Sequence, residues 1–273
     1  MAQGLPPDLD FTGVFSKLAR AEEHFKAVDS EISKWLEKGR YETFFERGAQ
    51  TGRIGIGLCQ IGPPPDLVRW ALIIGDCINN LRAALDHLAF LFTNLPAAYT
   101  PPAKERRVSF VIIDDPAEFG RAMKGNLSGF APKFSALFES LQPFMRIHPL
   151  LPPLLSIIRD LSNADKHRLL QVAGAGVVQL SATILGDTGR GTKIIGTNPE
   201  PIKNNDIICF IESAQPDPHL AVQSFAANVE IAIWHGARQN STNPLDARTG
   251  YSRLLPMLIA EVRFVIDQFK FAV

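Results

Sequence analysis

The chain has 273 residues, of which 46% are hydrophobic and 21% are charged, and its 28 basic side chains balance 28 acidic ones. This composition is typical of a globular protein, and the zero net charge gives no global electrostatic argument for nucleic-acid binding. The cysteines Cys59, Cys77 and Cys209 lack C-x-x-C spacing, which indicates small buried hydrophobes rather than a zinc site or a disulfide framework.

The sequence predicts neither a secretion signal nor a membrane anchor. Residues 1–12 lack the basic start and apolar centre of a signal peptide. The longest apolar window, 70–95, is interrupted by charged and amide side chains, which argues against a membrane span. We therefore expect a cytoplasmic protein that does not enter the membrane.

The first part of the chain combines helical and extended patterns. Apolar side chains at intervals of three and four predict helices, and two alternating stretches around a Gly-rich turn predict a β-hairpin. The expected helices lie at 12–38, 67–93, 117–124, 132–141 and 152–170, and the hairpin strands lie at 41–45 and 53–61. Asp10 or Thr12 can begin the first helix and Gly39 can end it.

After about residue 172 the pattern changes, because Gly and Thr become frequent and short alternating runs appear. Strands are expected at 176–184, 193–196, 206–213 and 225–234, followed by a last amphipathic helix at 250–271. The predicted fold is α+β, a mainly helical bundle with an N-terminal β-hairpin and a β-rich insertion before the C-terminal helix. We expect a single domain, 1–273, with a helical core at about 10–170 and 250–273 and a β-rich segment at about 172–236.

The helix expected at 67–93 carries an unusual set of polar side chains. At about 100° per residue, these side chains fall within an arc of about 160° on one side, opposite an apolar stripe. The polar arc consists of Asp76, Asn79, Asn80, Arg82, Asp86 and His87. Arg82 and Asp86 are four residues apart, which is close enough for an ion pair. The arc suits a polar seam against another helix, of the same chain or of a partner chain.

Two interpretations of the polar arc remain open. In the first, it is a structural network, with Arg82 bonded to Asp86 and the asparagines bonded across a helix interface. In the second, Arg82 and His87 are catalytic, and Asn79, Asn80 and Asp86 orient them. Arginine binds phosphate with a two-pronged fork and histidine transfers protons near neutral pH, which is what metal-independent RNA cleavage needs.

A second polar segment, 162–168, lies on the helix expected at 152–170. In an ideal helix Asp165 falls on the apolar stripe, and an inward carboxylate needs a hydrogen-bond donor. We expect this donor to be Arg82 or His87, which would join both segments into one network. A carboxylate beside His87 would also fix the tautomer of the imidazole ring.

The same segment allows two other interpretations. Asp165 and Arg168 could form a local pair near the helix end. Alternatively, Lys166, His167 and Arg168 could form a small basic patch that binds RNA phosphates. The histidines of the chain are not spaced as metal ligands, so we expect no metal and no cofactor.

The string from Arg82 to His87, R-x4-H on a helix, resembles the R-x4-6-H motif of HEPN-domain proteins. That family consists of small helical bundles, often dimeric, many of them RNases of toxin–antitoxin, CRISPR and phage-defence systems. Its Arg and His lie at the dimer cleft, and a polar residue commonly follows the Arg, where this chain has Ala83. The segments 75–90 and 162–170 also resemble a group of uncharacterised bacterial and phage-type proteins without an assigned activity.

The HEPN resemblance implies a metal-independent endoribonuclease of a defence or toxin–antitoxin system. Arg82 would hold the scissile phosphate, His87 would be the acid/base, and Asp165 would support them from the other helix. The expected partners are RNA, a second copy of the chain in a homodimer, and an antitoxin or other protein. The alternative is a non-enzymatic interaction or regulatory module in which the same residues form a structural network.

Overall fold

The computed structural model describes thirteen parts of the chain. They are residues 9–38, 41–47, 53–93, 108–125, 130, 134–146, 153–167, 170, 172–185, 193–196, 205–212, 221–234 and 248–273. The chain divides into two compact units. The helical unit consists of Met1–Val28, Ala71–Leu170 and Arg253–Val273, and the strand unit consists of Asp29–Trp70 and Gln171–Ser252. The single-domain expectation stays a prediction.

The helices follow the predicted pattern closely. They are α1 (Thr12–Leu36), α2 (Leu67–Thr93), α4 (Pro116–Gly125), α5 (Ser135–Ser140), α6 (Leu154–His167) and α7 (Tyr251–Phe271). Asp10 accepts a hydrogen bond from the backbone N–H of Thr12 at 2.8 Å, which caps the start of α1 as expected. Asp115 plays the same part for α4, since its carboxylate accepts from the N–H of Ala117 at 2.9 Å.

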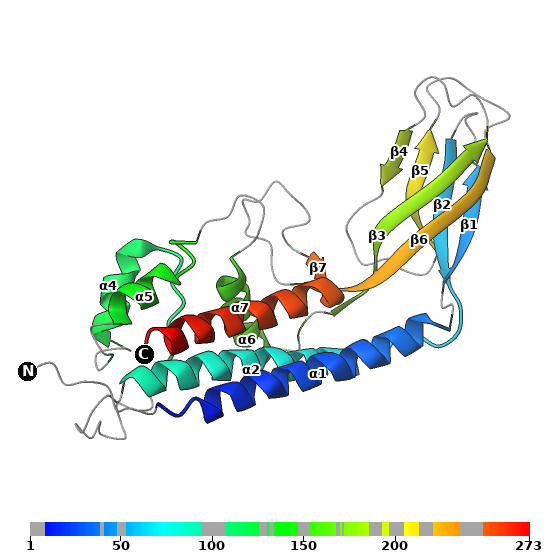
Figure 1. Ribbon diagram of the computed structural model, residues 1–273. Coiled ribbons are helices and arrows are strands. Elements are labelled where there is room, and N and C mark those ends of the chain that lie inside the picture. The colour runs from blue at the N-terminus through cyan, green and yellow to red at the C-terminus, as the bar shows by residue number, and fades with distance from the viewer. Residues whose placement is uncertain are drawn as a thin grey trace, which may run out of the picture. The chain divides into compact units, whose positions relative to one another are not determined.

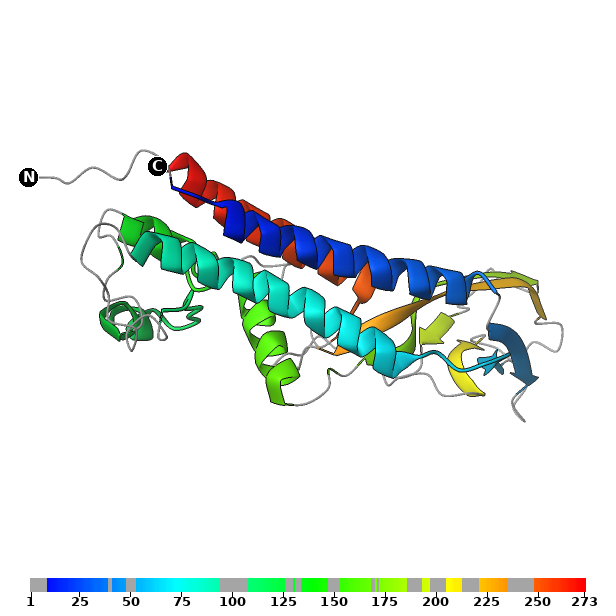
Figure 2. The same cartoon turned by 90° about the horizontal axis from the view of Figure 1, so that it is seen from below.

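Within the helical unit, α1, α2 and α7 lie side by side (Figures 1 and 2). The end of α7 packs against the end of α2, where the ring centroids of Phe92 and Phe269 are 4.9 Å apart. It also meets the start of α1, where the Lys270 Nζ lies 5.3 Å from the centre of the Phe15 ring. α1 therefore runs antiparallel to both α2 and α7.

The apolar stripes form the core of the helical unit. The α7 stripe predicted from its spacing is buried at every position: Leu254, Leu258, Val262, Val265 and Phe269. Fully buried phenylalanines close the end of the unit, and Phe110 and Phe138 are among them, with ring centroids 4.7 Å apart. Burial of such side chains contributes about 2–3 kcal/mol each to folding, which makes this aromatic cluster a main source of stability.

The apolar run at 108–113 forms no helix or strand, although Phe110 is completely buried and Val111 and Ile112 nearly so. A buried segment without ladder partners must satisfy its backbone N–H and C=O groups in another way. Side chains from α2, from α6 and from the residues after α5 supply those partners.

The strand unit contains two antiparallel sheets among the described residues. Their strands are β1 (Tyr41–Arg47), β2 (Arg53–Gln60), β3 (Val172–Leu185), β4 (Lys193–Gly196), β5 (Asp206–Glu212), β6 (Ala221–Trp234) and β7 (Arg248–Gly250). The first sheet has the order β1-β2-β5-β4 and the second β3-β6-β7. The predicted hairpin is present, with Tyr41 opposite Gln60 and Arg47 opposite Ile54.

The pairing of β2 with β5 places the hairpin in the strand unit rather than in the helical core expected at 10–170. The reason is the apolar β2 face: Ile54 and Ile56 are buried and pack with Cys209 and Ile211 of β5. β3 and β6 are longer than predicted, and the three-residue β7 was not predicted, because its pairing with β6 gives no signal in so short a run.

The fold class is α+β and mainly helical, with the hairpin and the β-rich segment in the predicted order. In the part of the chain that the structure describes, no helix combines the length and the apolar character needed to cross a membrane.

Candidate functional site

The polar arc of α2 divides into two groups that face different neighbours. The first group is centred on Asn79, which contacts α6. The Asn79 side-chain amide donates to the Asp165 carboxylate at 2.6 Å and accepts from the Ser162 hydroxyl at 3.1 Å. Both polar ends of this amide are therefore bonded to one helix, which fixes α6 against α2 at this level.

Gly75 makes the contact between Asp165 and α2 possible. A Cβ atom at position 75 would lie only 2.4 Å from the Asp165 Oδ1, which is closer than real Cβ contacts allow. Gly75 precedes Asn79 by one helical turn, so both residues lie beneath the carboxylate. The glycine, the asparagine and the aspartate thus form one packed unit, termed here the α2–α6 clasp.

The second group is centred on Asp86. Its Oδ1 lies 3.0 Å from the Arg82 Nη2 and accepts a hydrogen bond from the backbone N–H of Phe110 at 2.9 Å. The Arg82 side chain is only 16% exposed. The expected ion pair is therefore present, and its carboxylate holds the buried segment 108–113.

Two further side chains, which the sequence did not indicate, hold the same segment. The N–H of Ile113 donates to the Gln142 Oε1 at 2.9 Å, and Gln142 is completely buried. The Arg159 Nη1 of α6 donates to the carbonyl oxygen of Ile112 at 3.2 Å. Asp86, Gln142 and Arg159 thus replace the strand partners that the segment lacks. We call these three contacts the segment brace.

Arg159 is itself fixed by two carboxylates. Burial disfavours its charged form, but hydrogen bonds to Asp160 and Asp114, both at 2.8 Å, outweigh burial and raise the pKa of Arg159. Asp114 also accepts from the hydroxyl of the buried Ser156. The end of segment 108–113 is therefore anchored to α6 by hydrogen bonds to the charged guanidinium of Arg159.

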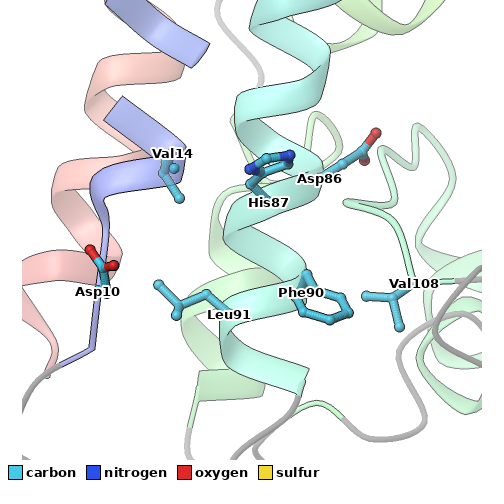
Figure 3. A pocket seen from close by; sticks show the side chains of 8 residues that line it. Asp10, Val14, Asp86, His87, Phe90, Leu91 and Val108 are labelled. Atoms are coloured by element: carbon cyan, nitrogen blue, oxygen red, sulfur yellow. The ribbon is translucent and has the colours of Figure 1, made fainter. Parts of the chain in front are cut away.

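His87, like Asp76, is exposed, and its side chain forms no hydrogen bond or ion pair with a described residue. Its Nδ1 lies 3.2 Å from the position that a Cβ on Gly13 would occupy, so the ring lies against the start of α1. Figure 3 shows His87 directed toward α1 and Asp86 directed away from it. The two residues flank a pocket of about 510 Å³.

Three further predicted site residues, Asn80, Lys166 and His167, do not meet at a common centre. Asn80 bonds to its own helix, donating to the carbonyl oxygen of Asp76 at 2.8 Å. Lys166 and His167 are exposed at the end of α6. Arg168 lies outside the described residues, so its pairing with Asp165 and its part in a basic patch stay predictions.

The expected donor to Asp165 was wrong. Asp165 is directed inward to α2, as its helical position predicted, but its donor is Asn79 rather than Arg82 or His87. His87 lies eight residues beyond Asn79, which is about 12 Å along the helix axis. Asp165 therefore bonds neither Arg82 nor His87 in the described structure, and the two segments meet at the α2–α6 clasp and through the Ser162–Asn79 hydrogen bond beside it.

The comparisons give no relative for this chain: no family model, no curated protein and no solved structure matches it. Among the described residues, no group of three or more His, Cys, Asp or Glu side chains is arranged to hold a metal ion. The interpretation of the site consequently depends on its own geometry.

Proposed function

We propose that this protein is a non-enzymatic interaction or regulatory module. In this proposal, termed the brace proposal, the polar arc of α2 has a structural part and holds segment 108–113 through Asp86. The observation that carries the proposal is that Asp86 binds two groups of its own chain. One oxygen of this carboxylate pairs with Arg82 and accepts from Phe110, so the arginine that would bind a phosphate already has an internal anion.

The surroundings of Arg82 and His87 support the same proposal. A phosphate-binding arginine needs an accessible guanidinium and a positive field, but Arg82 is mostly covered and its charge is neutralised by Asp86. Among the described residues, the pocket beside His87 is lined by two carboxylates, Asp10 and Asp86, and by no Lys or Arg. Since Asp86 is paired with Arg82, the Asp10 carboxylate is the lining group that would repel a phosphodiester here.

The HEPN-like endoribonuclease is the second candidate, because His87 is exposed, has no partner among the described residues, and carries an imidazole, a common general acid or base. In this proposal a second copy of the chain would have to supply the accessible cation. Arg82 would then act by placing Asp86, and a dimer would bring two histidines to one cleft.

RNA incubation in EDTA separates the two candidates. The full chain, Arg82→Ala and His87→Ala are purified in parallel and mixed with a long unstructured RNA, and the products are separated by gel electrophoresis. The brace proposal predicts no cleavage above the buffer control for any of the three proteins. Cleavage by the wild type that is lost in His87→Ala, with the helical circular dichroism unchanged, would overturn it in favour of the RNase.

A further inference from the structure

A pocket of about 510 Å³ lies between the start of α1 and the last turns of α2. Figure 3 shows Asp10 and Val14 on the α1 side, Leu91 and Phe90 on α2, and Val108 on the segment that follows. Its volume is within the range of pockets that bind small organic ligands. All of its lining residues belong to the helical unit.

The walls of the pocket are mainly apolar. Val14, Phe90, Leu91 and Val108 contribute hydrocarbon and an aromatic ring, and Phe90 is 42% exposed although it is a large apolar side chain. A ligand with an apolar body would cover this exposed surface, which is the main source of affinity in such pockets.

The described residues that line the pocket carry a net negative charge. The Asp86 charge is balanced by Arg82, and Asp10 is the lining carboxylate that has no ion-pair partner in the described part of the chain. Hydrogen bonds from Thr12 hold the pKa of Asp10 below its ordinary value, so Asp10 is ionised at neutral pH. The Thr12 N–H donates to the Oδ1 of Asp10 at 2.8 Å, and a carboxylate accepts more than one hydrogen bond, so Asp10 keeps acceptor capacity for a ligand.

The polar groups at the rim are suited to a donor. A neutral imidazole offers one acceptor nitrogen, and His87 has no partner among the described residues. An ammonium group carries three N–H donors and prefers carboxylate oxygens, imidazole nitrogen and the face of an aromatic ring. Asp10 and His87 present the first two of these groups on the α1 side of the pocket, and Phe90 lies on the side toward Val108 (Figure 3).

From this combination we infer that the pocket between α1 and α2 binds a small organic ammonium ion with an apolar body, with Asp10 as its counter-ion and Phe90 and Leu91 against its hydrocarbon. This inference names a ligand class for the interaction module and extends the proposed function. It does not depend on the segment brace, because Asp10 takes no part in that brace.

The test is a titration of the full chain followed by amide NMR, with three probes of similar size. Phenethylammonium carries the charge, 2-phenylethanol is its neutral counterpart, and 3-phenylpropionate is an anion. We expect phenethylammonium to shift the amides of Gly13, Val14 and Leu91 and to bind several-fold, up to about fivefold, more tightly than 2-phenylethanol, as one charge pair near the surface provides. Equal binding of the charged and neutral probes, or preference for the anion, would overturn the inference.

Two substitutions locate the charge. Asp10→Asn keeps an oxygen that accepts from Thr12, so α1 stays capped, but it removes the negative charge. It should weaken phenethylammonium binding about fivefold and leave 2-phenylethanol unaffected. Asp76→Asn, on the exposed side of α2 away from the pocket, is the matched control and should change neither. An unchanged affinity in Asp10→Asn would contradict the assignment.

The outcome also separates this inference from the proposed function. If no probe binds while RNA remains intact, the ligand assignment is wrong and the proposed function is unaffected. If RNA is cleaved in a His87-dependent manner while the ammonium probe binds, the proposed function is wrong and the ligand assignment is unaffected.

Discussion

At the residue scale, Gly75 shows how a single missing side chain fixes a helix contact. Glycine inside a helix costs about 1 kcal/mol relative to alanine, so a glycine in the middle of α2 needs a compensating reason. That reason is the Asp165 carboxylate, which occupies the space where a Cβ would be. The same carboxylate then bonds Asn79, which holds α6 in place.

Substitution of Gly75 by alanine should therefore destabilise the helical unit, against the usual direction of a glycine-to-alanine change. Displacement of Asp165 should cost about 1–3 kcal/mol net of the gain in helix propensity. Gly120 in α4 is the matched control, because a Cβ there would meet no atom within 4 Å. Gly120→Ala should stabilise by up to about 1 kcal/mol. Urea unfolding followed by helical circular dichroism measures both, and a stabilising Gly75→Ala would refute the clasp.

Cys77 gives a pH prediction at the same scale. Burial raises the pKa of its thiol to about 12 from an ordinary value of 9.0. Between these values the unfolded chain releases a proton that the folded chain keeps, so the stability of the native state falls as the pH rises above about 9. From about pH 8 to about pH 10 this contribution is about 1.4 kcal/mol.

Cys77→Ala removes this contribution and serves as the control. The loss of stability between the two pH values should be about 1.4 kcal/mol smaller in the variant than in the wild type. Comparing the two proteins cancels the contributions of Tyr41 and Cys209, whose pKa values burial also raises. Identical pH dependence in the two proteins would show that the thiol is not buried as described.

At the element scale, the segment 108–113 is held by side chains rather than by a ladder. Asp86 comes from α2, Gln142 follows α5 and Arg159 comes from α6, so three parts of the chain meet on one extended segment. Each of these side chains satisfies one buried backbone group, and loss of a partner leaves that group unpaired at a cost of about 1–3 kcal/mol.

Hydrogen exchange can test this arrangement one amide at a time. Asp86→Ala should raise the exchange rate of the Phe110 amide at least tenfold, because its acceptor is lost, while the Ile113 amide keeps Gln142. Gln142→Ala should have the reverse effect on the two amides. Equal protection of Phe110 in the wild type and Asp86→Ala would mean that the carboxylate does not hold the segment.

The sequence predicted the elements better than the contacts between them. The bounds of α2 and the burial of the α7 stripe follow from local periodicity, which the chain carries within each helix. The helical wheel also predicted that Asp165 is directed inward. It did not predict the donor, because a helical wheel gives the direction of a side chain around its own helix axis. It does not give the level along α2 that Asp165 reaches. Gln142 and Arg159 gave no signal, since their partners are distant backbone groups.

At the scale of the whole molecule, the two units can be followed separately. The tryptophans Trp35, Trp70 and Trp234 all belong to the strand unit. Tryptophan fluorescence therefore reports on that unit, whereas the helical circular dichroism reports mainly on the other, which contains most of the helical residues.

The most direct test of the central claim compares the free energy of unfolding of Arg82→Ala and His87→Ala by the circular dichroism transition in urea. If the R-x4-H segment is a brace, Arg82→Ala should cost about 1–3 kcal/mol, because Asp86 loses its cation in a mostly covered position. His87→Ala should stay within about 0.5 kcal/mol of the wild type, since the ring is exposed and has no partner among the described residues. A free energy of unfolding of Arg82→Ala equal to that of the wild type would contradict the brace proposal.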